Sequence, residues 1–181
     1  GRVVSHDGQS VEDYLAEKLA AYPSLMVLQT LQQSEFMRAL NPRSINTVRV
    51  VTIRDPATRK PHAVRAVVRV GSEYSGPVDN FSRGGIAFAL DLETGLIGNG
   101  VRKAKPSGWD RVEHHPDSGM PIAGKVLPHI HKIRERCEML LSRMPYVDYV
   151  GWDICVGEDD LYVVEGNNTT DVDLLQAHGP L

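Results

Sequence analysis

Residues 149–167 read YVGWDICVGEDDLYVVEGN, and this stretch decides which fold the chain is expected to adopt. Two runs rich in β-branched and aromatic residues, 149–156 and 161–165, flank the turn-forming residues 157–160. Apolar runs of this length on either side of Gly and Asp residues predict an antiparallel β-hairpin. Each run also contains one acid, Asp153 in the first and Glu165 in the second.

The register of this hairpin decides whether the two acids meet. If the turn is centred on Asp159, Asp153 faces Glu165, and directly opposed Cβ atoms lie about 4.5–5.5 Å apart. Two carboxylates among apolar neighbours repel each other, so either one is protonated or a cation lies between them. A four-residue turn would instead oppose Asp153 to Val164 and turn Glu165 to the other face, as in an exposed edge hairpin whose acids face water.

A third oxygen donor follows the second acid. Asn167 lies two residues beyond Glu165, so it projects to the same face if the strand continues. Carboxylate and amide oxygens are hard donors that suit Mg²⁺ or Mn²⁺ and suit zinc poorly. Because Mg²⁺ usually combines one or two carboxylates with substrate phosphates, Asp153, Glu165 and Asn167 predict a metal–phosphate site.

The remaining chain alternates between helical and extended patterns. Four successive strands with short connections predict an antiparallel meander, and an amphipathic stripe beginning at Ile122 and ending before Pro145 predicts a helix. Residues 103–121 are polar and irregular. The expected fold class is α+β, a mostly antiparallel sheet with packed helices. The other expected elements are a helix over 10–21, a strand over 25–31, a helical turn over 36–40, and strands over 45–54, 62–70, 85–92 and 96–102.

Composition narrows the class of protein. A chain of 181 residues with 41% hydrophobic residues and a net charge of −3 fits one ordinary domain without the broad cationic field that binds nucleic acid. No apolar run approaches the roughly 20 residues that span a bilayer, so no membrane insertion is expected. Cys137 and Cys155 lack CxxC neighbours and are interpreted as buried reduced thiols of a cytoplasmic protein.

Three arginines interrupt apolar strands. Arg49 lies inside the run TVRVV, where a guanidinium either reaches water at an edge or is aimed at an anion. Arg65 and Arg69 share one strand face, which is either a basic surface toward a cleft or a plain solvent-facing surface.

Two loops carry further candidate residues. Asn80 and Arg83 precede the Gly84–Gly85 pair, where backbone can approach a phosphate closely or simply make a tight turn. His115 lies in a loop that faces either a substrate or the solvent, because no clustered His or Cys ligands complete a zinc set around it.

Four segments together resemble the ATP-grasp superfamily, and within it the sugar-transfer associated group. The resemblance covers nearly the whole chain in matching order, and its most specific part is an acid followed about twelve residues later by ExN. The segments are SINTVRVVT at 44–52, VDNFSRGG at 78–85, HPDSG at 115–119, and VGWDI at 150–154 with VVEGN at 163–167.

This resemblance implies the C-terminal lobe of an ATP-dependent carboxylate–amine ligase-like enzyme, with a role in polysaccharide or cell-envelope biosynthesis. Such enzymes hold ATP between two lobes, with Mg²⁺ or Mn²⁺ on its phosphates. They phosphorylate a small-molecule carboxylate, and an amine or similar nucleophile attacks the acylphosphate. An Arg together with acids for Mg²⁺ agrees with this chemistry, because phosphoryl transfer depends on positioning and charge neutralisation.

The resemblance also implies residue roles. The metal ligands would be Asp153, Glu165 and Asn167; the contact to phosphate or the reacting carboxylate would be Arg49; the adenine contacts near the hinge would be Gln29 and Gln32; and the acceptor side would be lined by Asn80, Arg83 and His115.

The domain organisation follows from the same resemblance. Residues 1–25 would be a remnant of the preceding lobe and the hinge approach, and residues 26–181 would be the C-terminal lobe. The lysines that bind phosphates in the family would come from a missing N-terminal ATP-grasp lobe, so weak nucleotide binding and no turnover are expected of this chain alone. Two alternatives stay open: a non-catalytic truncated lobe that acts as a binding module, and a metal-dependent hydrolase that uses Asp153 and Glu165.

Overall fold

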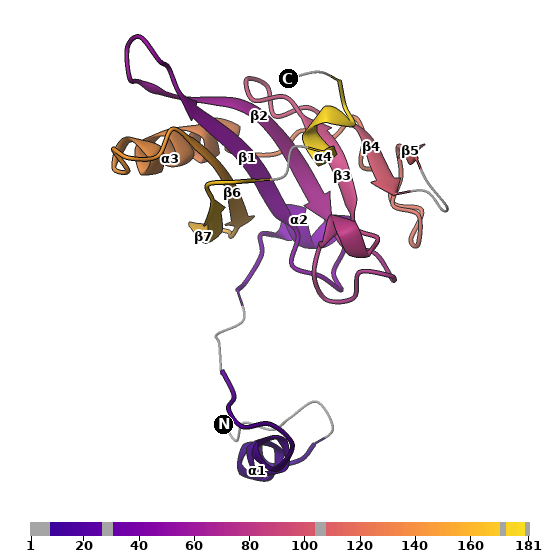
Figure 1. Ribbon diagram of the computed structural model, residues 1–181. Coiled ribbons are helices and arrows are strands. Elements are labelled where there is room, and N and C mark those ends of the chain that lie inside the picture. Colours follow the sequence, from indigo (N-terminus) through magenta and orange to yellow (C-terminus); the bar gives the residue numbers. More distant parts are fainter. Residues whose placement is uncertain (1–7, 27–30, 104–107, 171–172, 180–181) are drawn as a thin grey trace. The chain divides into compact units, whose positions relative to one another are not determined.

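The computed structural model describes residues 8–26, 31–103, 108–170 and 173–179 (Figure 1). The chain divides into two compact units, Gly1–Thr30 and Leu31–Leu181. Residues 27–30, which hold most of the expected strand over 25–31, lie outside the described residues, and its described ends are not in a strand. Whether the first unit is the remnant of another lobe stays a prediction.

The first unit contains α1 (Val11–Ala21), as expected from the helical spacing. The Ser10 side chain accepts a hydrogen bond from the Asp13 backbone N–H at 3.1 Å, which satisfies one of the free donors of the first turn. The acids Glu12 and Asp13 lie at the positive end of the helix dipole. No residue of α1 is buried.

The second unit is built on a seven-stranded sheet in which every neighbouring pair is antiparallel, so the α+β class is confirmed (Figure 1). The order across the sheet is β5-β4-β3-β2-β1-β6-β7, so the chain returns after β5 to the open side of β1. The strands are β1 (Thr47–Arg54), β2 (Pro61–Val70), β3 (Ile86–Leu90), β4 (Ile97–Lys103), β5 (Trp109–Val112), β6 (Tyr149–Val156) and β7 (Leu161–Asn167).

Helices cover both faces of this sheet. On one face, α2 (Glu35–Leu40) and α3 (Ile130–Ser142) bury their apolar residues in the larger core, against Val48 and Val50 of β1. On the other face, Leu174 and Leu175 of α4 (Asp173–Gln176) pack with Val51 and Val67 in a smaller cluster. Side chains of β1 that point to opposite faces of the sheet therefore pack into two separate apolar layers.

The structure differs from the expected elements in three places. The helix α3 begins at Ile130 and not at Ile122, because His129 has a φ of 61° and Pro128 lacks the N–H that a helix interior needs. Val126, expected on the helix, forms an isolated bridge with Leu96. The strand β5 and the helix α4 arise within segments where no regular element was expected.

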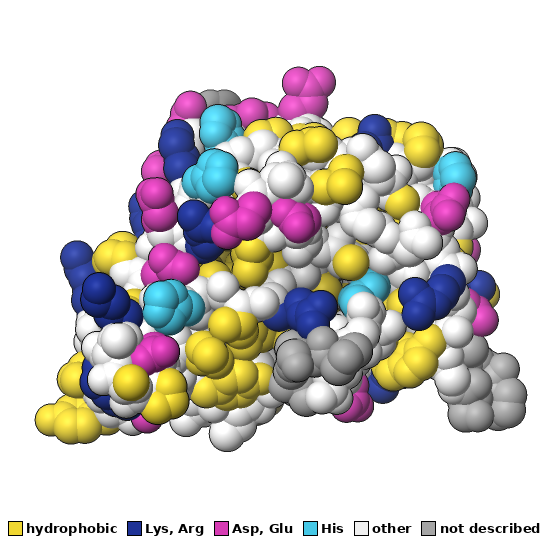
Figure 2. Space-filling model, turned by 90° about the horizontal axis from the view of Figure 1, so that it is seen from above, with side chains coloured by type: hydrophobic (Ala, Val, Ile, Leu, Met, Phe, Trp, Pro, Cys, Tyr) yellow, Lys and Arg dark blue, Asp and Glu magenta, His cyan; other side chains and the backbone are white. Residues whose placement is uncertain are grey.

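The two cysteines are buried, as expected, and the surface seen in Figure 2 carries charges of both signs. Cys137 and Cys155 are both free and buried, and burial raises the pKa of the Cys137 thiol to about 12. Acidic and basic side chains are interspersed on the face seen in Figure 2. Among the helices that the structure describes, none is long and apolar enough to cross a membrane.

Candidate functional site

The hairpin of β6 and β7 places Asp153 directly opposite Glu165. Near the turn, Val156 pairs with Leu161, which is the four-residue turn that by itself would oppose Asp153 to Val164. The register shifts between Asp153 and the next residue, so Val164 is the extra residue of a β-bulge and Glu165 returns to the face of Asp153. The two acids therefore meet as predicted, although the turn is the alternative one.

A cation lies between the two carboxylates, and it is the guanidinium of Arg49. Arg49 pairs with Asp153 across β1 and β6, donates from Nε to Oδ1, and donates from Nη2 to Oδ2 at 2.8 Å. The same Nη2 lies 3.8 Å from Oε1 of Glu165. Nη1 donates to Oγ1 of Thr170 at 2.6 Å. The side chains of Arg49 and Asp153 are 8% and 5% exposed, whereas that of Glu165 is 54% exposed.

A second arginine, Arg69, extends this series of ion pairs. The series is called the charge row, and it runs through Glu165, Arg49, Asp153, Arg69 and Asp79. Nη1 of Arg69 donates to Oδ2 of Asp153 at 2.6 Å, and Nη2 lies 2.9 Å from Oδ1 of Asp79. Asp79 in turn accepts hydrogen bonds from the Thr47 backbone N–H, at 2.9 Å, and from the Thr47 hydroxyl. Arg69 is therefore a largely buried ion-pairing residue with its side chain 11% exposed, and the solvent-facing alternative for it is wrong.

Burial and pairing compete in setting the charge states. Burial acts to raise the pKa of Asp153, but the hydrogen bond from Arg49 and the charge of Arg69 outweigh it, so this pKa lies below its ordinary value. Burial raises the pKa of Asp79 above its ordinary value despite the nearby charge of Arg69. The interior row is thus made of two cations and two carboxylates, with Glu165 at its exposed end.

Glu165 and Asn167 converge on one side of β7. Nδ2 of Asn167 donates to Oε1 of Glu165 at 2.9 Å, which leaves the amide oxygen of Asn167 available. In residues 8–26, 31–103, 108–170 and 173–179, no three His, Cys, Asp or Glu side chains form a group that could hold a metal ion. The predicted metal site therefore needs the Asn167 oxygen as its third donor.

The donor chemistry of this trio fits a hard divalent cation. A carboxylate offers about four lone-pair positions. Oδ1 of Asp153 accepts one hydrogen bond from the arginines and Oδ2 accepts two. These hydrogen bonds leave a lone pair on Oδ1 of Asp153, so the three residues fit the predicted cation.

Of the two predicted adenine contacts, the structure describes Gln32, which lies toward the turn end of the hairpin. Gln29 is outside the described residues. Gln32 is exposed, and two residues later the Ser34 N–H donates to the Val156 carbonyl at 2.8 Å, so this segment runs beside the end of β6. The neighbouring Gln33 has a structural role, because its side chain bonds the Ser44 carbonyl and the Asn46 N–H at 2.7 Å each.

The loop after Asp79 holds two of the predicted acceptor-side residues. Oδ1 of Asn80 accepts the Ser82 N–H at 2.9 Å and begins a short 3₁₀ turn, Phe81–Arg83. Arg83 is exposed at the end of that turn. Asn80 directly follows Asp79 in the chain, and a contact of Asn80 or Arg83 with a ligand stays a prediction.

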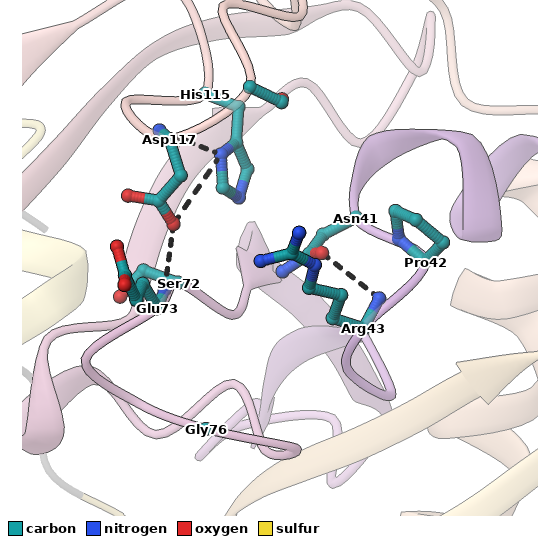
Figure 3. Close-up of a pocket in the computed structure, with 9 residues that line it drawn as sticks. Asn41, Pro42, Arg43, Ser72, Glu73, Gly76, His115 and Asp117 are labelled. Carbon is teal, nitrogen blue, oxygen red and sulfur yellow. Dashed lines mark hydrogen bonds and ion pairs between the residues drawn. The ribbon is translucent and has the colours of Figure 1, made fainter.

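His115 lies in a different place, on the wall of a cavity of about 390 Å³ (Figure 3). Its Nδ1 accepts the Asp117 N–H at 3.2 Å and its Nε2 is 2.8 Å from the Gly71 carbonyl, so both ring nitrogens are occupied. Asn41 and Arg43 face it across the cavity in Figure 3. The structure thus brings Arg49, Asp153, Glu165 and Asn167 together but not His115.

Three members of the site were not singled out from the sequence. They are Arg69 as an ion-pair partner, Asp79, and Thr170. One feature of the sequence could have indicated these ion pairs. Arg49 and Arg69 each interrupt a strand rich in β-branched residues, and a guanidinium buried in such a strand needs a carboxylate partner. The partners themselves come from β6 and from loops, which strand periodicity does not bring together.

Comparison with known families identifies the family of this chain. The family described as sugar-transfer associated ATP-grasp matches residues 15–179, which is most of the chain. The chain belongs to the sugar-transfer associated ATP-grasp family. ATP-grasp proteins generally use ATP and Mg²⁺ and act on small molecules. Comparisons with curated proteins and with solved structures found no match.

Proposed function

We propose that this chain is part of an enzyme that uses ATP to join a carboxylate to an amine or similar nucleophile. A carboxylate oxygen attacks the γ-phosphorus and ADP leaves; the nucleophile then attacks the acyl carbon, phosphate leaves, and the amine loses a proton. Family membership supports this function, together with one observation: the continuous row of Arg49, Asp153 and Glu165, with Asn167 on the same side.

In this function, Asp153, Glu165 and Asn167 hold Mg²⁺ or Mn²⁺. The bound ion neutralises charge on the ATP phosphates. Arg49 contributes a second positive charge that cannot be lost, because a guanidinium remains protonated. Its hydrogen bonds to Asp153 and Thr170 use three of its five N–H donors, so two remain for oxygens of the ligand.

The other predicted roles belong to the same proposal. Gln29 and Gln32 would contact adenine, and Asn80, Arg83 and His115 would line the acceptor side. The phosphate-binding lysines would come from a preceding lobe. The reaction would take place in the cytoplasm, where Cys137 and Cys155 stay reduced, and it would serve polysaccharide or cell-envelope biosynthesis. The family's association with sugar transfer supports that setting.

The substitution Glu165→Gln tests the metal site. It keeps the size of an exposed side chain but removes the charge, so Mg²⁺-dependent affinity for a non-hydrolysable ATP analogue should fall at least about tenfold. Glu113→Gln is the matched control, because Glu113 is also exposed and lies outside the site. Calorimetric titration of both variants with and without Mg²⁺ measures the effect, and unchanged affinity in Glu165→Gln would refute the metal assignment.

A specific observation favours a second candidate function, a non-catalytic binding module. The charge of Asp153 is already neutralised by Arg49 and Arg69, so the buried part of the charge row has balanced charges without a metal ion. In that case a phosphate-bearing ligand would bind equally well with Mg²⁺ or with a chelator. The titration of the unsubstituted protein separates the two functions.

A further inference from the structure

One cavity of the molecule lies outside the charge row. It is the cavity of about 390 Å³ shown in Figure 3, and it is lined by three loops, at residues 41–43, 72–76 and 115–118. No residue of the charge row lines it. Pockets that bind small molecules have volumes of about 300–1,000 Å³, so this cavity has the size of a ligand site.

Hydrogen bonds between the loops hold the walls of this cavity in place. The carbonyl of Gly71 accepts from Nδ2 of Asn41 at 2.9 Å and pairs with Nε2 of His115 at 2.8 Å. Because a carbonyl only accepts, the proton of His115 is on Nε2, and Nδ1 accepts the Asp117 N–H at 3.2 Å. Asn41 and His115 are 7% and 2% exposed. A ligand therefore meets walls that are already ordered, which lowers the cost of binding.

The walls of the cavity carry opposite charges. Glu73 and Asp117 lie on one side, where Oδ2 of Asp117 accepts the Glu73 N–H at 2.7 Å (Figure 3). Arg43 lies across the cavity from them. Among the ion pairs that the described residues form, none involves Arg43 or Glu73. The cavity thus presents a cation and two carboxylates that do not pair with each other.

A ligand that matches both walls carries charges of both signs. An ammonium group donates up to three hydrogen bonds, and the carboxylates of Glu73 and Asp117 can accept them. A carboxylate group matches the planar guanidinium of Arg43, which can donate two parallel hydrogen bonds to it. A ligand with only one kind of charge would satisfy one wall and be repelled by the other.

We propose that this cavity binds a small zwitterion, a molecule with one ammonium and one carboxylate group, such as a free amino acid. The ammonium group lies between Glu73 and Asp117, and the carboxylate group lies on Arg43. His115 holds the loop of Asp117 against Gly71. The site uses no residue of the predicted metal site, so it goes beyond the proposed function.

Three related probes test the two charged contacts separately. At pH 7, L-alanine is a zwitterion, N-acetyl-L-alanine lacks the ammonium group and L-alaninamide lacks the carboxylate group. NMR titration of the full chain, followed at the backbone amides of residues 72–76 and 115–118, reports binding at this place. We expect L-alanine to bind at least about tenfold more tightly than either derivative, because each derivative lacks one charge-assisted contact.

Two substitutions of exposed side chains should each remove one contact. Arg43→Gln should weaken the binding of L-alanine about tenfold without weakening that of L-alaninamide. Glu73→Gln should weaken the binding of L-alanine and L-alaninamide without weakening that of N-acetyl-L-alanine. Arg38→Gln is the matched control, because Arg38 of α2 is also exposed and does not line the cavity.

Several results would overturn the inference. If N-acetyl-L-alanine binds as tightly as L-alanine, the cavity is a plain anion site, and if L-alaninamide does, it is a plain cation site. No binding of L-alanine, amide shifts only outside these loops, or unchanged binding in Arg43→Gln and Glu73→Gln would also overturn it. The titration contains neither nucleotide nor Mg²⁺, so these failures leave the proposed function to its own test in Glu165→Gln.

Discussion

Thr170 connects the candidate site to the strand beneath it. Its hydroxyl oxygen accepts a hydrogen bond from Nη1 of Arg49 at 2.6 Å, and the Thr170 side chain lies over Gly151 of β6. Gly151 pairs with Val51 on one side and with Asn167 on the other. The absence of a side chain at Gly151 therefore leaves the space in which Thr170 reaches Arg49.

A methyl group at position 151 should disturb that contact. In Gly151→Ala the new Cβ would lie 2.6 Å from Cβ of Thr170, so Thr170 must move away from Arg49. Overpacking of this kind costs about 1–3 kcal/mol of unfolding free energy. We also expect weaker Mg²⁺-dependent binding of the ATP analogue.

Gly98→Ala is the control for this substitution, because its Cβ would meet only Ala89, at 3.3 Å, in a different part of the sheet. Denaturant unfolding and calorimetric titration measure the two effects. If Gly151→Ala binds the analogue as tightly as Gly98→Ala, Thr170 does not support Arg49.

At the scale of elements, α4 covers the sheet face that carries the site. Its Leu174 and Leu175 are buried with Val51 and Val67, directly beyond the segment that contains Thr170. The helix has only four residues, so its position depends on this apolar contact and on the residues that follow it. His178 supplies one such contact, with Nε2 3.1 Å from the Ala87 carbonyl of β3.

The His178 contact should make stability depend on pH. Burial lowers the pKa of His178 below 6.5, the carbonyl of Ala87 acts in the opposite sense, and the charges of Arg111 and Arg65 lower it further. The unfolded chain therefore binds a proton that the folded chain does not. The resulting stability is present above pH 6.5 and is lost as the pH falls below it, toward the lowered pKa of the folded state.

His178→Gln should remove this part of the pH dependence, because Gln does not titrate but still offers an N–H to Ala87. Melting temperatures at pH 7.5 and pH 5.5 in matched buffers provide the comparison. An equal loss of stability in the variant and in the unsubstituted protein would show that His178 is not the titrating group.

At the scale of the whole molecule, the core belongs to the second unit. Large side chains such as Phe88, Ile97 and Ile133 are fully buried between the sheet and its helices, and the smaller cluster lies on the opposite face. The helix of the first unit contributes no buried residue. The unit Leu31–Leu181 therefore contains the apolar layers that stabilise the fold.

A chain that begins at Leu31 should unfold like the longer one. The expected change in unfolding free energy is within about 0.5 kcal/mol, because no residue of α1 is buried and changes at exposed residues have effects of that size. Trp109 and Trp152 both remain in the shortened chain, so tryptophan fluorescence during urea unfolding measures both proteins in the same way. A loss of several kcal/mol would mean that the first unit stabilises the second.

Local patterns predicted much of the fold. The strands that became β1, β2, β6 and β7 were readable because β-branched residues alternate between turn-forming segments. The start of α3 at Ile130 was not readable. Val126 continues the apolar spacing by chance, and the helix is interrupted by Pro128 and by the positive φ of His129, which the apolar spacing does not show. The short strand β5 carries too few apolar residues to produce a pattern.

The amino-acid sequence alone determined that two acids and an amide lie on the last hairpin, because residue type and order are local properties. That Asp153 faces Glu165 depended on the bulge at Val164. Only the tertiary structure decided which cation lies between the acids. Arg49 precedes Asp153 by 104 residues, and the two pair only because α3 carries the chain back to the free side of β1. The bulge at Val164 and the Arg69–Asp79 pair depend likewise on the packing of distant segments, which no local pattern records.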